Sequence, residues 1–502
     1  MDSRSIGPSR REFLGLAGGG CAALVLAACS AGGPTRVAVG GPEVQDAERR
    51  RQRPGSMTRD ITLTAAPATI DLGGRTVETW AYGGSVPGRE LRVRAGDVLR
   101  AKITNRLPEP TTIHWHGLAL RNDMDGVPGL TQAPIAAGAD FTYQFVVPEP
   151  GTFWFHPHFG LQLDRGLYTP LVIEDPAEPG RYDREIVVVL DDWLSGIGPT
   201  PEDTLKGLRE NGMQMGSGGG MAQSPALGGD AGDVMYPTFL VNGRQGTNPV
   251  TLEAKAGERI RLRILNAGGD TAFRVALGGH RLTVTHTDGF PVEPVTVDAL
   301  LIGMSERYDV TVTVAGDGAF PLVAAAEGKG GQAMAVLRSA SGATPPADVH
   351  PAELDGRLLQ LGELRAAKAV ALAPKRPDRT HQVALGGPGK TGYHWTINGK
   401  EVDKEADVLK DAKVLEVGQG QRVRMVFENQ TTMFHPMHLH GHTFQVVGPD
   451  GAAGPRKDSM IVRPKERIAV DFDADNPGQW LIHCHNLYHQ SAGMHSVLSY
   501  VR

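Results

Sequence analysis

Cysteine is scarce in this chain, with only Cys21, Cys29 and Cys484 among 502 residues. So few cysteines do not support the framework of disulfides that many exported proteins use. Cys21 and Cys29 lie in an N-terminal segment with a different role, so Cys484 is left without a partner. A thiol flanked by histidines, as Cys484 is, is then expected to be a metal ligand.

Strong net charge and aromatic residues are also lacking. The net charge of -5 gives no reason to expect nucleic acid as a partner. Aromatic residues make up 6%, whereas 65 glycines and 35 prolines fit short strands joined by many turns. The length suggests about three domains, each large enough for its own core.

A long apolar run is missing as well, because the N-terminal run ends at Ala28 and is too short for a comfortable membrane span. It follows Arg10-Arg11, a twin-arginine pattern, and leads to Cys29 in a sequence that resembles a lipobox. We expect residues 1–28 to be a twin-arginine (Tat) signal peptide. The folded protein would then reach the periplasm or cell envelope with a lipid on Cys29 as its only membrane contact. Ordinary cleavage in this alanine-rich region, which would release the protein, is the alternative.

Three segments align without gaps and share a Gly, an Arg four residues later and an Asn nine residues later. They are 96–105, 257–266 and 420–429, with first glycines 161 and 163 residues apart. Each is an alternating strand entered by a turn, so the repeat predicts three consecutive all-β sandwich domains with Greek-key connections. The predicted ranges are 58–178, 179–340 and 381–502, with a flexible linker at 29–57 and another linker at 341–380.

Histidine pairs follow this repeat in the first and third domains only. His114 and His438 come nine residues after Asn105 and Asn429, and each has a second histidine two residues on; Val275 and Leu277 occupy these offsets in the second domain. A further pair follows Gly151 and Gly478 in the same way. Facing copies of the two domains would gather eight imidazoles, which suit a multinuclear copper cluster: His114, His116, His156, His158, His438, His440, His483 and His485.

A second, different site is predicted around Cys484. Alternation along a strand sends Cys484 to one face and its neighbouring histidines to the other. Cys484, His489 and His435, with Met494 as a weak partner, form the soft ligand set of a blue copper site. Zinc is the chemical alternative, but isolated zinc sites do not need so many histidines. The remaining histidines fall outside the alignment and are expected to be ordinary structural or surface residues: His280, His286, His350, His381, His394, His442 and His495.

The motifs His114-Trp-His116-Gly, His156-Pro-His158, His435-Pro-Met-His438-Leu-His440-Gly and His483-Cys484-His485 through Met494 resemble the multicopper oxidases. The likeness is closest to the bacterial three-domain laccases and cuprous oxidases. It implies three cupredoxin-like domains and four copper ions, with electrons from a donor reducing O2 to water. It also implies type 1 ligands at His435, Cys484 and His489 with Met494 axial, and type 2 ligands at His114 and His438. The implied type 3 ligands are His116, His156, His158, His440, His483 and His485.

Two positions bear on proton delivery in such an enzyme. Asp125 occupies the position of the family's acidic residue near the cluster, where a carboxylate relays protons or orients water. The other interpretation is an Asp that forms a turn before Gly126. Gln490 stands where several bacterial relatives have Glu, and an amide cannot exchange protons.

The electron donor is the least constrained part of the prediction. Met213, Met215 and Met221 lie in a glycine-rich segment that extends to Met235, and thioethers select Cu(I). Met433 and Met437 flank His435 and could line the same entry, although Thr431 stands where a cuprous oxidase has a substrate-binding Asp. The leading hypothesis is a monomeric enzyme that oxidises Cu(I) in copper detoxification. A laccase for phenols and aromatic amines, with 211–235 as a plain linker, and a non-enzymatic copper-binding protein are the alternatives.

Overall fold

The computed structural model describes residues 34–502 except 176–177, 179–181, 213–221, 389–391, 403–407 and 450. The expected signal peptide, Cys29, Met213, Met215 and Met221 lie outside these residues. Residues 36–502 pack as one unit. Among the described residues there is no helix that is both long and apolar enough to cross a membrane.

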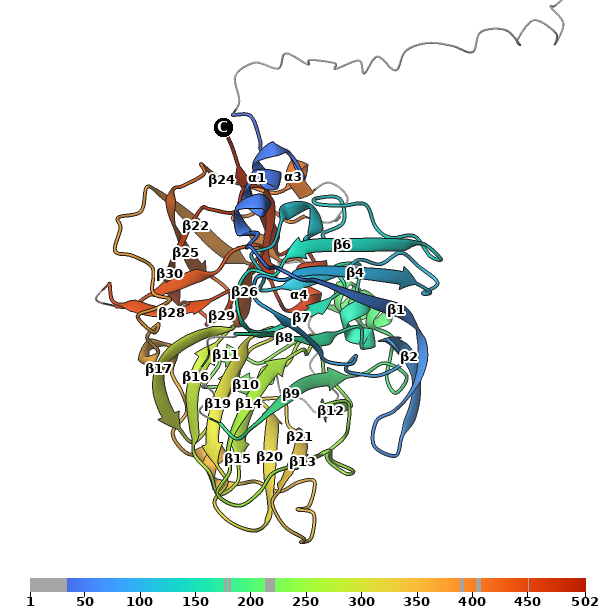
Figure 1. Cartoon of the computed structure of the whole chain (residues 1–502). Coiled ribbons are helices and arrows are strands. Elements are labelled where there is room, and N and C mark those ends of the chain that lie inside the picture. The colour runs from blue at the N-terminus through green and yellow to red at the C-terminus, as the bar shows by residue number, and fades with distance from the viewer. Residues whose placement is uncertain are drawn as a thin grey trace, which may run out of the picture. The chain divides into compact units, whose positions relative to one another are not determined.

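Domain 1 is a sandwich of two four-stranded sheets (Figure 1). One sheet has the order β2 (Thr76–Tyr82), β1 (Thr58–Asp71), β4 (Val98–Asn105) and β6 (Asp140–Val146). The other has the order β3 (Leu91–Arg94), β8 (Thr169–Glu174), β7 (Gly151–His156) and β5 (His114–His116). The histidine pairs therefore lie on, or directly after, two neighbouring strands of the second sheet.

Domain 2 has a six-stranded and a five-stranded sheet. The first has the order β12 (Thr238–Val241), β9 (Arg184–Trp193), β14 (Arg259–Asn266), β19 (Arg307–Thr313), β16 (Leu282–Thr287) and β17 (Phe290–Val297). The second has the order β13 (Thr251–Glu253), β21 (Gln332–Arg338), β20 (Ala319–Ala326), β15 (Phe273–Leu277) and β18 (Leu300–Ile302). A helix, α2 (Pro201–Asn211), and a hairpin of β10 (Gln223–Ser224) and β11 (Gly229–Asp230) lie between β9 and β12 in sequence.

Domain 3 repeats this arrangement. Its first sheet has the order β23 (Thr396–Ile397), β22 (Arg379–Gly386), β25 (Arg422–Asn429), β30 (Arg467–Asp473), β27 (Phe444–Val447) and β28 (Ala453–Lys457). Its second has the order β24 (Leu415–Val417), β32 (His495–Tyr500), β31 (Gln479–Cys484), β26 (His435–Leu439) and β29 (Ser459–Val462). Two short helices, α3 (Val408–Asp411) and α4 (Leu487–Ser491), complete the domain. The prediction of three β-sandwich domains is confirmed.

The sequence repeat has the same structural role in all three domains. The repeated strand lies parallel to the first strand of its domain, as β4 does to β1, β14 to β9 and β25 to β22. Its glycine has a left-handed φ of 80–88° in each copy, a conformation that glycine adopts without steric cost. Its asparagine is buried and donates from Nδ2 to two backbone carbonyls, one of them four or five residues ahead. This asparagine therefore shapes the loop that leads to the next strand, which carries the histidines in domains 1 and 3.

Residues 34–57, the described part of the predicted flexible linker 29–57, contain regular structure. They include helix α1 (Pro42–Arg51), whose Val44 and Ala47 are buried. Residues just before the helix pair with the C-terminal strand: the Val37 N–H donates to the Tyr500 carbonyl over 2.8 Å (Figure 1). The sequence signal was missed because the charged run at the end of this helix is typical of a solvated segment. The segment 341–380 contains two 3-10 turns, Ala352–Asp355 and Leu361–Glu363, and buries Leu354 with side chains of domain 2.

Candidate metal centre

The thiol of Cys484 lies between two imidazoles in domain 3. Its Sγ is 3.6 Å from Nδ1 of His435 and 3.6 Å from Nδ1 of His489, and these two nitrogens are 3.0 Å apart. All three side chains are fully buried. His435 comes from β26, Cys484 ends β31 and His489 lies on α4, so strand pairing and a short helix bring them together.

Outer partners determine which imidazole nitrogens face the thiol. His489 Nε2 lies 2.9 Å from Oδ2 of Asp233, and His435 Nε2 lies 2.9 Å from Oγ1 of Thr431. A carboxylate only accepts, and the Thr431 hydroxyl already donates to Asn429 or Met433, so both Nε2 atoms donate. Both Nδ1 atoms therefore carry lone pairs, which repel each other at 3.0 Å unless a cation lies between them.

The three donor atoms fit a metal ion. A point equidistant from them lies about 2 Å from each, close to the length of a metal–imidazole bond. Burial raises the pKa of the Cys484 thiol, so a bound cation is what would favour the thiolate. Met494 is buried, and its backbone carbonyl accepts from the Cys484 N–H over 3.1 Å. Trp395 packs against His489 with ring centroids 3.9 Å apart and the rings tilted by 32°, and it closes one side of the site.

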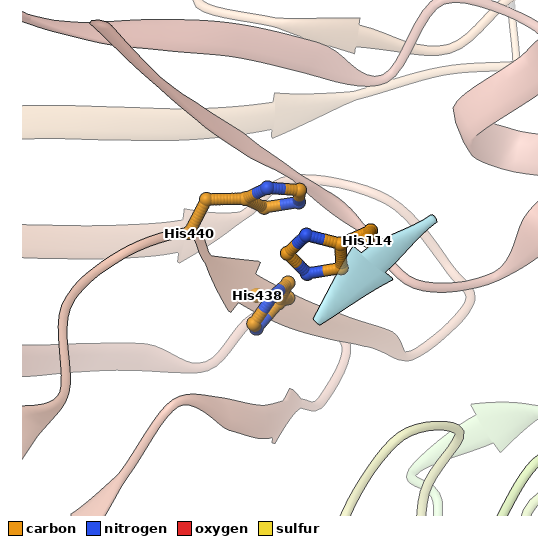
Figure 2. A group of neighbouring side chains, drawn as sticks. All are labelled: His114, His438 and His440. Atoms are coloured by element: carbon orange, nitrogen blue, oxygen red, sulfur yellow. The ribbon is translucent and has the colours of Figure 1, made fainter. Parts of the chain in front are cut away.

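A second cluster contains the eight predicted imidazoles, all buried. Domain 1 supplies four from β5, the end of β7 and the residues after it, and domain 3 supplies four from β26 and β31 and the residues that follow these strands. Figure 2 shows His114 from β5 facing His438 and His440. The rings of His114 and His440 stack at 3.8 Å, as do those of His116 and His438. Donor atoms come within 4.8 Å of one another in the groups His114/His438/His440, His114/His116/His156 and His158/His440/His483.

Most of these imidazoles use one nitrogen as a hydrogen-bond donor. Nδ1 of His156, His438 and His483 faces the carbonyls of Pro157, Asp458 and Cys484. Nε2 of His440 and His483 face each other at 3.1 Å. Seven nitrogens of the cluster have no hydrogen-bond partner: Nε2 of His114, His156, His158 and His438, Nδ1 of His116, and both nitrogens of His485. A buried nitrogen without a hydrogen-bond partner destabilises the folded protein. A role as metal ligand explains why these nitrogens are left without one.

The cluster is built to remain uncharged on its own. Burial first, and then the neighbouring imidazoles, hold the pKa of His156, His158, His440, His483 and His485 well below the usual value. Neutral imidazoles keep a lone pair free at working pH, as metal binding requires.

Asp125 is fully buried beside this cluster. Its Oδ2 accepts from His440 Nδ1 over 2.9 Å, and its carbonyl accepts from His114 Nδ1 over 3.0 Å. The next residue, Gly126, has a φ of +81°, and a Cβ there would lie 1.9 Å from the Ile113 carbonyl oxygen. The turn at Asp125 therefore packs directly on the strand that carries His114. Asp125 ends a 3-10 turn, as one interpretation of the sequence has it, and also orients two imidazoles; its role in relaying protons or orienting water stays a prediction.

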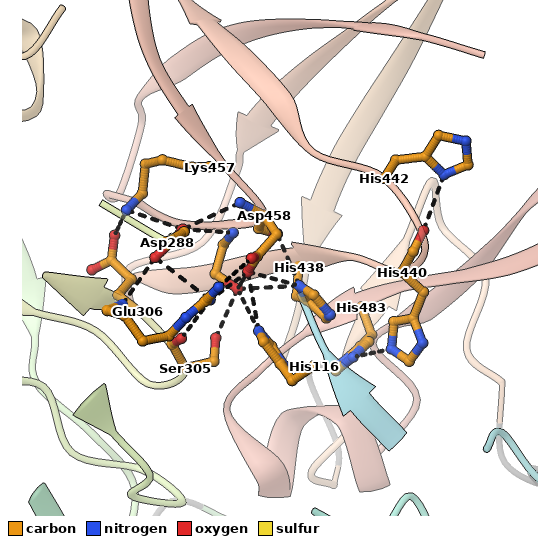
Figure 3. A network of polar contacts seen from close by, with 12 residues as sticks. His116, Asp288, Ser305, Glu306, His438, His440, His442, Lys457, Asp458 and His483 are labelled. Atoms are coloured by element: carbon orange, nitrogen blue, oxygen red, sulfur yellow. Dashed lines mark hydrogen bonds and ion pairs between the residues drawn. The ribbon is translucent and has the colours of Figure 1, made fainter. Parts of the chain in front are cut away.

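Two acidic residues at these sites were missed by sequence reasoning. Asp233 of domain 2 contacts His489, and Asp458 of domain 3 contacts His116. Asp458 joins a buried network of charged residues from domains 2 and 3 (Figure 3). No local pattern marks either residue, since their partners lie 256 and 342 residues away in sequence. Domain 2, which has no histidine of the cluster, therefore still contributes to the surroundings of the sites.

Several other residues singled out from the sequence lie close to the two sites without forming part of their donor sets. Met433 and Met437 are fully buried near His435. The side-chain amide of Gln490 lies 3.2 Å from Nδ1 of His158. His442, two residues after His440, does not join the cluster: its Nε2 bonds the Tyr500 hydroxyl over 2.6 Å. His495 is buried opposite His483 in the pairing of β31 with β32, with its Nδ1 on the Gln490 carbonyl.

The fold and the two sites define a class of protein. It is a three-domain β-sandwich metalloprotein with one thiolate site and one polyhistidine site, and imidazole with thiolate is a donor set that suits copper. Sequence profiles described as multicopper oxidase match residues 64–178, 184–342 and 375–501. The chain belongs to the multicopper oxidase family.

Individual relatives agree with this assignment. The chain is 48% identical to multicopper oxidase MmcO of Mycobacterium tuberculosis, over 98% of this chain and 97% of that protein. It is 29% identical to a copper resistance protein A homolog of Pseudomonas syringae pv. tomato, over 88% and 92% of the two chains. The crystal structure of a laccase from Botrytis aclada is similar with a TM-score of 0.72 at 28% identity, covering 89% and 88%. The predicted cupredoxin-like fold class and the prediction of an oxygen-using copper oxidoreductase are confirmed.

Proposed function

We propose that the chain is a four-copper oxidase that takes electrons from a donor at the Cys484 site and reduces O2 to water at the eight-histidine cluster. Type 1 copper would be held by His435, Cys484 and His489 with Met494, and type 2 copper by His114 and His438. The type 3 pair would be held by the remaining cluster histidines: His116, His156, His158, His440, His483 and His485. The main support for this proposal is that Cys484 lies in the sequence directly between two histidines of the cluster, His483 and His485.

Copper held at the two sites would supply the electron transfer itself. The protein supplies the path, because Cys484 is covalently joined to His483 and His485, whose rings lie in the cluster. The Cys484 carbonyl also accepts from His483 Nδ1 over 2.9 Å, which fixes that ring against the same peptide. Asp125 holds His440 and His114 in place and is the carboxylate that we assign to orient water or relay protons beside them.

We favour Cu(I) as the donor because two carboxyl-bearing residues of domain 2 lie beside the segment that carries Met433 and His435. Asp233 bonds His489 at the nitrogen that faces away from Cys484. Asp230 forms a backbone bridge with Met433, just before His435. A carboxylate attracts a cation, and a thioether prefers Cu(I) among the common ions. Asp230 and Asp233 thus supply, from domain 2, the acidic group that Thr431 does not. Resemblance to a copper resistance protein supports the same donor.

A laccase activity on phenols or aromatic amines is the second candidate. A carboxylate beside the type 1 histidine can also accept a hydrogen bond from a phenol or an aniline, and the structural likeness to a laccase favours this activity. The burial of Asp233 and Met433 limits the room for an aromatic ring, which is why we place this activity second.

Oxygen uptake by copper-loaded protein lacking residues 1–28 distinguishes the two donors. With Cu(I) as donor, we expect kcat/KM to exceed that for a phenol, and Asp233→Asn to lower it about tenfold, since 1.4 kcal/mol of lost attraction corresponds to a factor of ten. Replacing Met213, Met215 and Met221 with Leu should reduce Cu(I) turnover further. Asp471→Asn, in a domain 3 salt bridge with Arg424, is the matched control. Efficient uptake with phenol alone would make the enzyme a laccase.

We also propose that the protein is exported by the Tat pathway and held in the cell envelope by a lipid on Cys29, as a monomer. The twin-arginine and lipobox patterns support this location. Tat export takes place after folding, which suits an enzyme that binds a cofactor. Replacing Arg10 and Arg11 with Lys should keep the protein in the cytoplasm, whereas Cys29→Ala should release it from the membrane fraction. Membrane association that survives Cys29→Ala would contradict the lipid anchor, and light scattering tests the monomer.

A further inference from the structure

The turn between β28 and β29 places Asp458 against a cluster histidine of another domain. Its Oδ1 accepts from His116 Nε2 over 3.1 Å, although the two residues lie 342 positions apart. Its carbonyl accepts from His438 Nδ1 over 2.9 Å. Asp458, His116 and His438 are all buried, so water does not compete for these hydrogen bonds. One residue of domain 3 thus orients one histidine from each half of the cluster.

Asp458 is positioned to orient a ligand and not to bind metal itself. Its two oxygens receive a bidentate contact from Arg307 at 2.7 and 2.6 Å, and Oδ1 also receives the Ser459 hydroxyl at 3.0 Å. These donors and His116 Nε2 saturate Oδ1, and the guanidinium covers Oδ2. The guanidinium charge beside the carboxylate would also repel a cation.

Because of its hydrogen bond to Asp458, His116 leaves a different ring nitrogen free for a metal than the neighbouring histidines do. Because His116 Nε2 is the donor to Asp458, the nitrogen left without a partner is Nδ1. In His114, His156 and His438 the donor is Nδ1, and the nitrogen without a partner is Nε2. Without the hydrogen bond to Asp458, the His116 ring would be free to rotate or change tautomer. Its Nδ1 would then no longer be held in position as a ligand.

Arg307 belongs to domain 2 and contacts all three domains. Its Nε donates to the Thr152 carbonyl of domain 1 over 3.0 Å, and its Nη atoms hold Asp458 of domain 3. Asp288 of domain 2 lies 3.6 Å away and also binds Lys457, which in turn contacts Glu306 (Figure 3). The network thus fixes the position of Arg307, and through it Asp458, against both halves of the cluster.

We propose that Asp458, clamped by Arg307, is the positioning residue that makes His116 present Nδ1 to the metal, so that domain 2 is required for full copper loading of a cluster to which it gives no ligand. The inference rests on the proposed copper function. Outer partners of metal-bound histidines have effects of about 10- to 100-fold on metal affinity when they are removed. Asp458→Asn should therefore weaken retention of cluster copper by about that factor.

The test compares copper retention site by site in the full-length folded protein. Wild type, Asp458→Asn and Arg307→Lys are loaded with copper and then titrated with a chelator, while copper per chain and the blue absorption of the thiolate site are recorded together. Arg307→Lys keeps the buried positive charge but loses the bidentate geometry, so it guards against a folding failure of Asp458→Asn. We expect both variants to lose cluster copper at least about tenfold more readily and to keep the blue band.

The control is Asp471→Asn, because Asp471 also receives a bidentate arginine, Arg424, within domain 3 but touches no cluster histidine. It should retain copper as the wild type does. Equal retention in all four proteins would overturn the proposal. Loss of the blue band together with cluster copper would also overturn it, since that result means general misfolding. Wild type that binds copper but consumes no oxygen would contradict the proposed function and leave the comparison of copper retention valid.

Discussion

At the scale of single residues, most imidazoles of the two sites are oriented by a contact to one nitrogen; His485, with no partner on either nitrogen, is the exception. Thr431 and Asp233 accept hydrogen bonds from Nε2 of His435 and His489, which leaves both Nδ1 atoms facing Cys484. In the cluster, backbone carbonyls and carboxylates do the same for other rings. Since each partner fixes a ring before any metal arrives, the ligands are preorganised, and little reorganisation is expected on binding.

Replacing Cys484 with Ser tests the thiolate site directly. Serine keeps the size of the side chain but offers no soft donor, so the blue absorption should disappear. Donor-driven oxygen uptake should fall by more than the roughly 10- to 100-fold effect typical of an outer-shell change. Visible absorption and an oxygen electrode measure the two effects. Cluster copper should be retained, because His483 and His485 are unchanged, and its loss would contradict the separation of the two sites.

The pH dependence of Cu(I) oxidation should report Asp230. Burial raises the pKa of this carboxyl to about 6, with further upward contributions from Asp233 and Asp270 and a downward one from His489. The carboxylate is charged above this pH and neutral below it. We therefore expect kcat/KM for Cu(I) to fall as the pH drops through about 6, and Asp230→Asn to flatten this part of the profile. An unchanged profile in Asp230→Asn would exclude the residue from cation capture.

At the scale of elements, the repeated strand explains how the histidines are placed. β4, β14 and β25 each start after a left-handed glycine and end at an asparagine that braces the following loop. The next strand begins at His114 in domain 1 and at His435 in domain 3. Its counterpart in domain 2 begins at Phe273 and contains Val275 and Leu277 in place of histidines. One scaffold thus carries ligands in two copies and a buried apolar surface in the third.

Helix α1 gives a prediction about stability. Val44 is 1% exposed, so Val44→Ser should cost about 1.5–3 kcal/mol of unfolding free energy, the value of burying such a side chain. The thermal midpoint should fall by several degrees. Arg50→Ser, on the exposed side of the same helix, is the control and should change it little. Equal midpoints for the two variants would mean that α1 does not stabilise the folded unit.

The fold and the cluster could be predicted from the sequence because their signals are local and repeated. The Gly–Arg–Asn spacing indicated three domains, and the offset from Asn105 and Asn429 to the histidines indicated a shared cluster. Asp458 and Asp233 could not be predicted in this way, because each acts across a domain interface and has no periodic neighbour. Helix α1 was missed since only Val44 and Ala47 of its ten residues are buried, which gives almost no apolar pattern.

At the scale of the whole molecule, the three domains have unequal roles in one centre. Domain 3 contains the thiolate site, domains 1 and 3 share the cluster, and domain 2 supplies Asp233 to one site and Arg307 to the other. The cluster histidines therefore depend on correct packing of all three domains.

The proposed function couples one-electron oxidation at the Cys484 site to complete reduction of O2 at the histidine cluster. The measurement that tests it most directly is the ratio of Cu(I) oxidised to O2 consumed by the copper-loaded enzyme, with hydrogen peroxide assayed in parallel. Reduction of O2 to water takes four electrons, so we predict about four Cu(I) ions per O2 and no peroxide. A ratio near two with peroxide released, or no oxygen uptake although both sites hold copper, would contradict it.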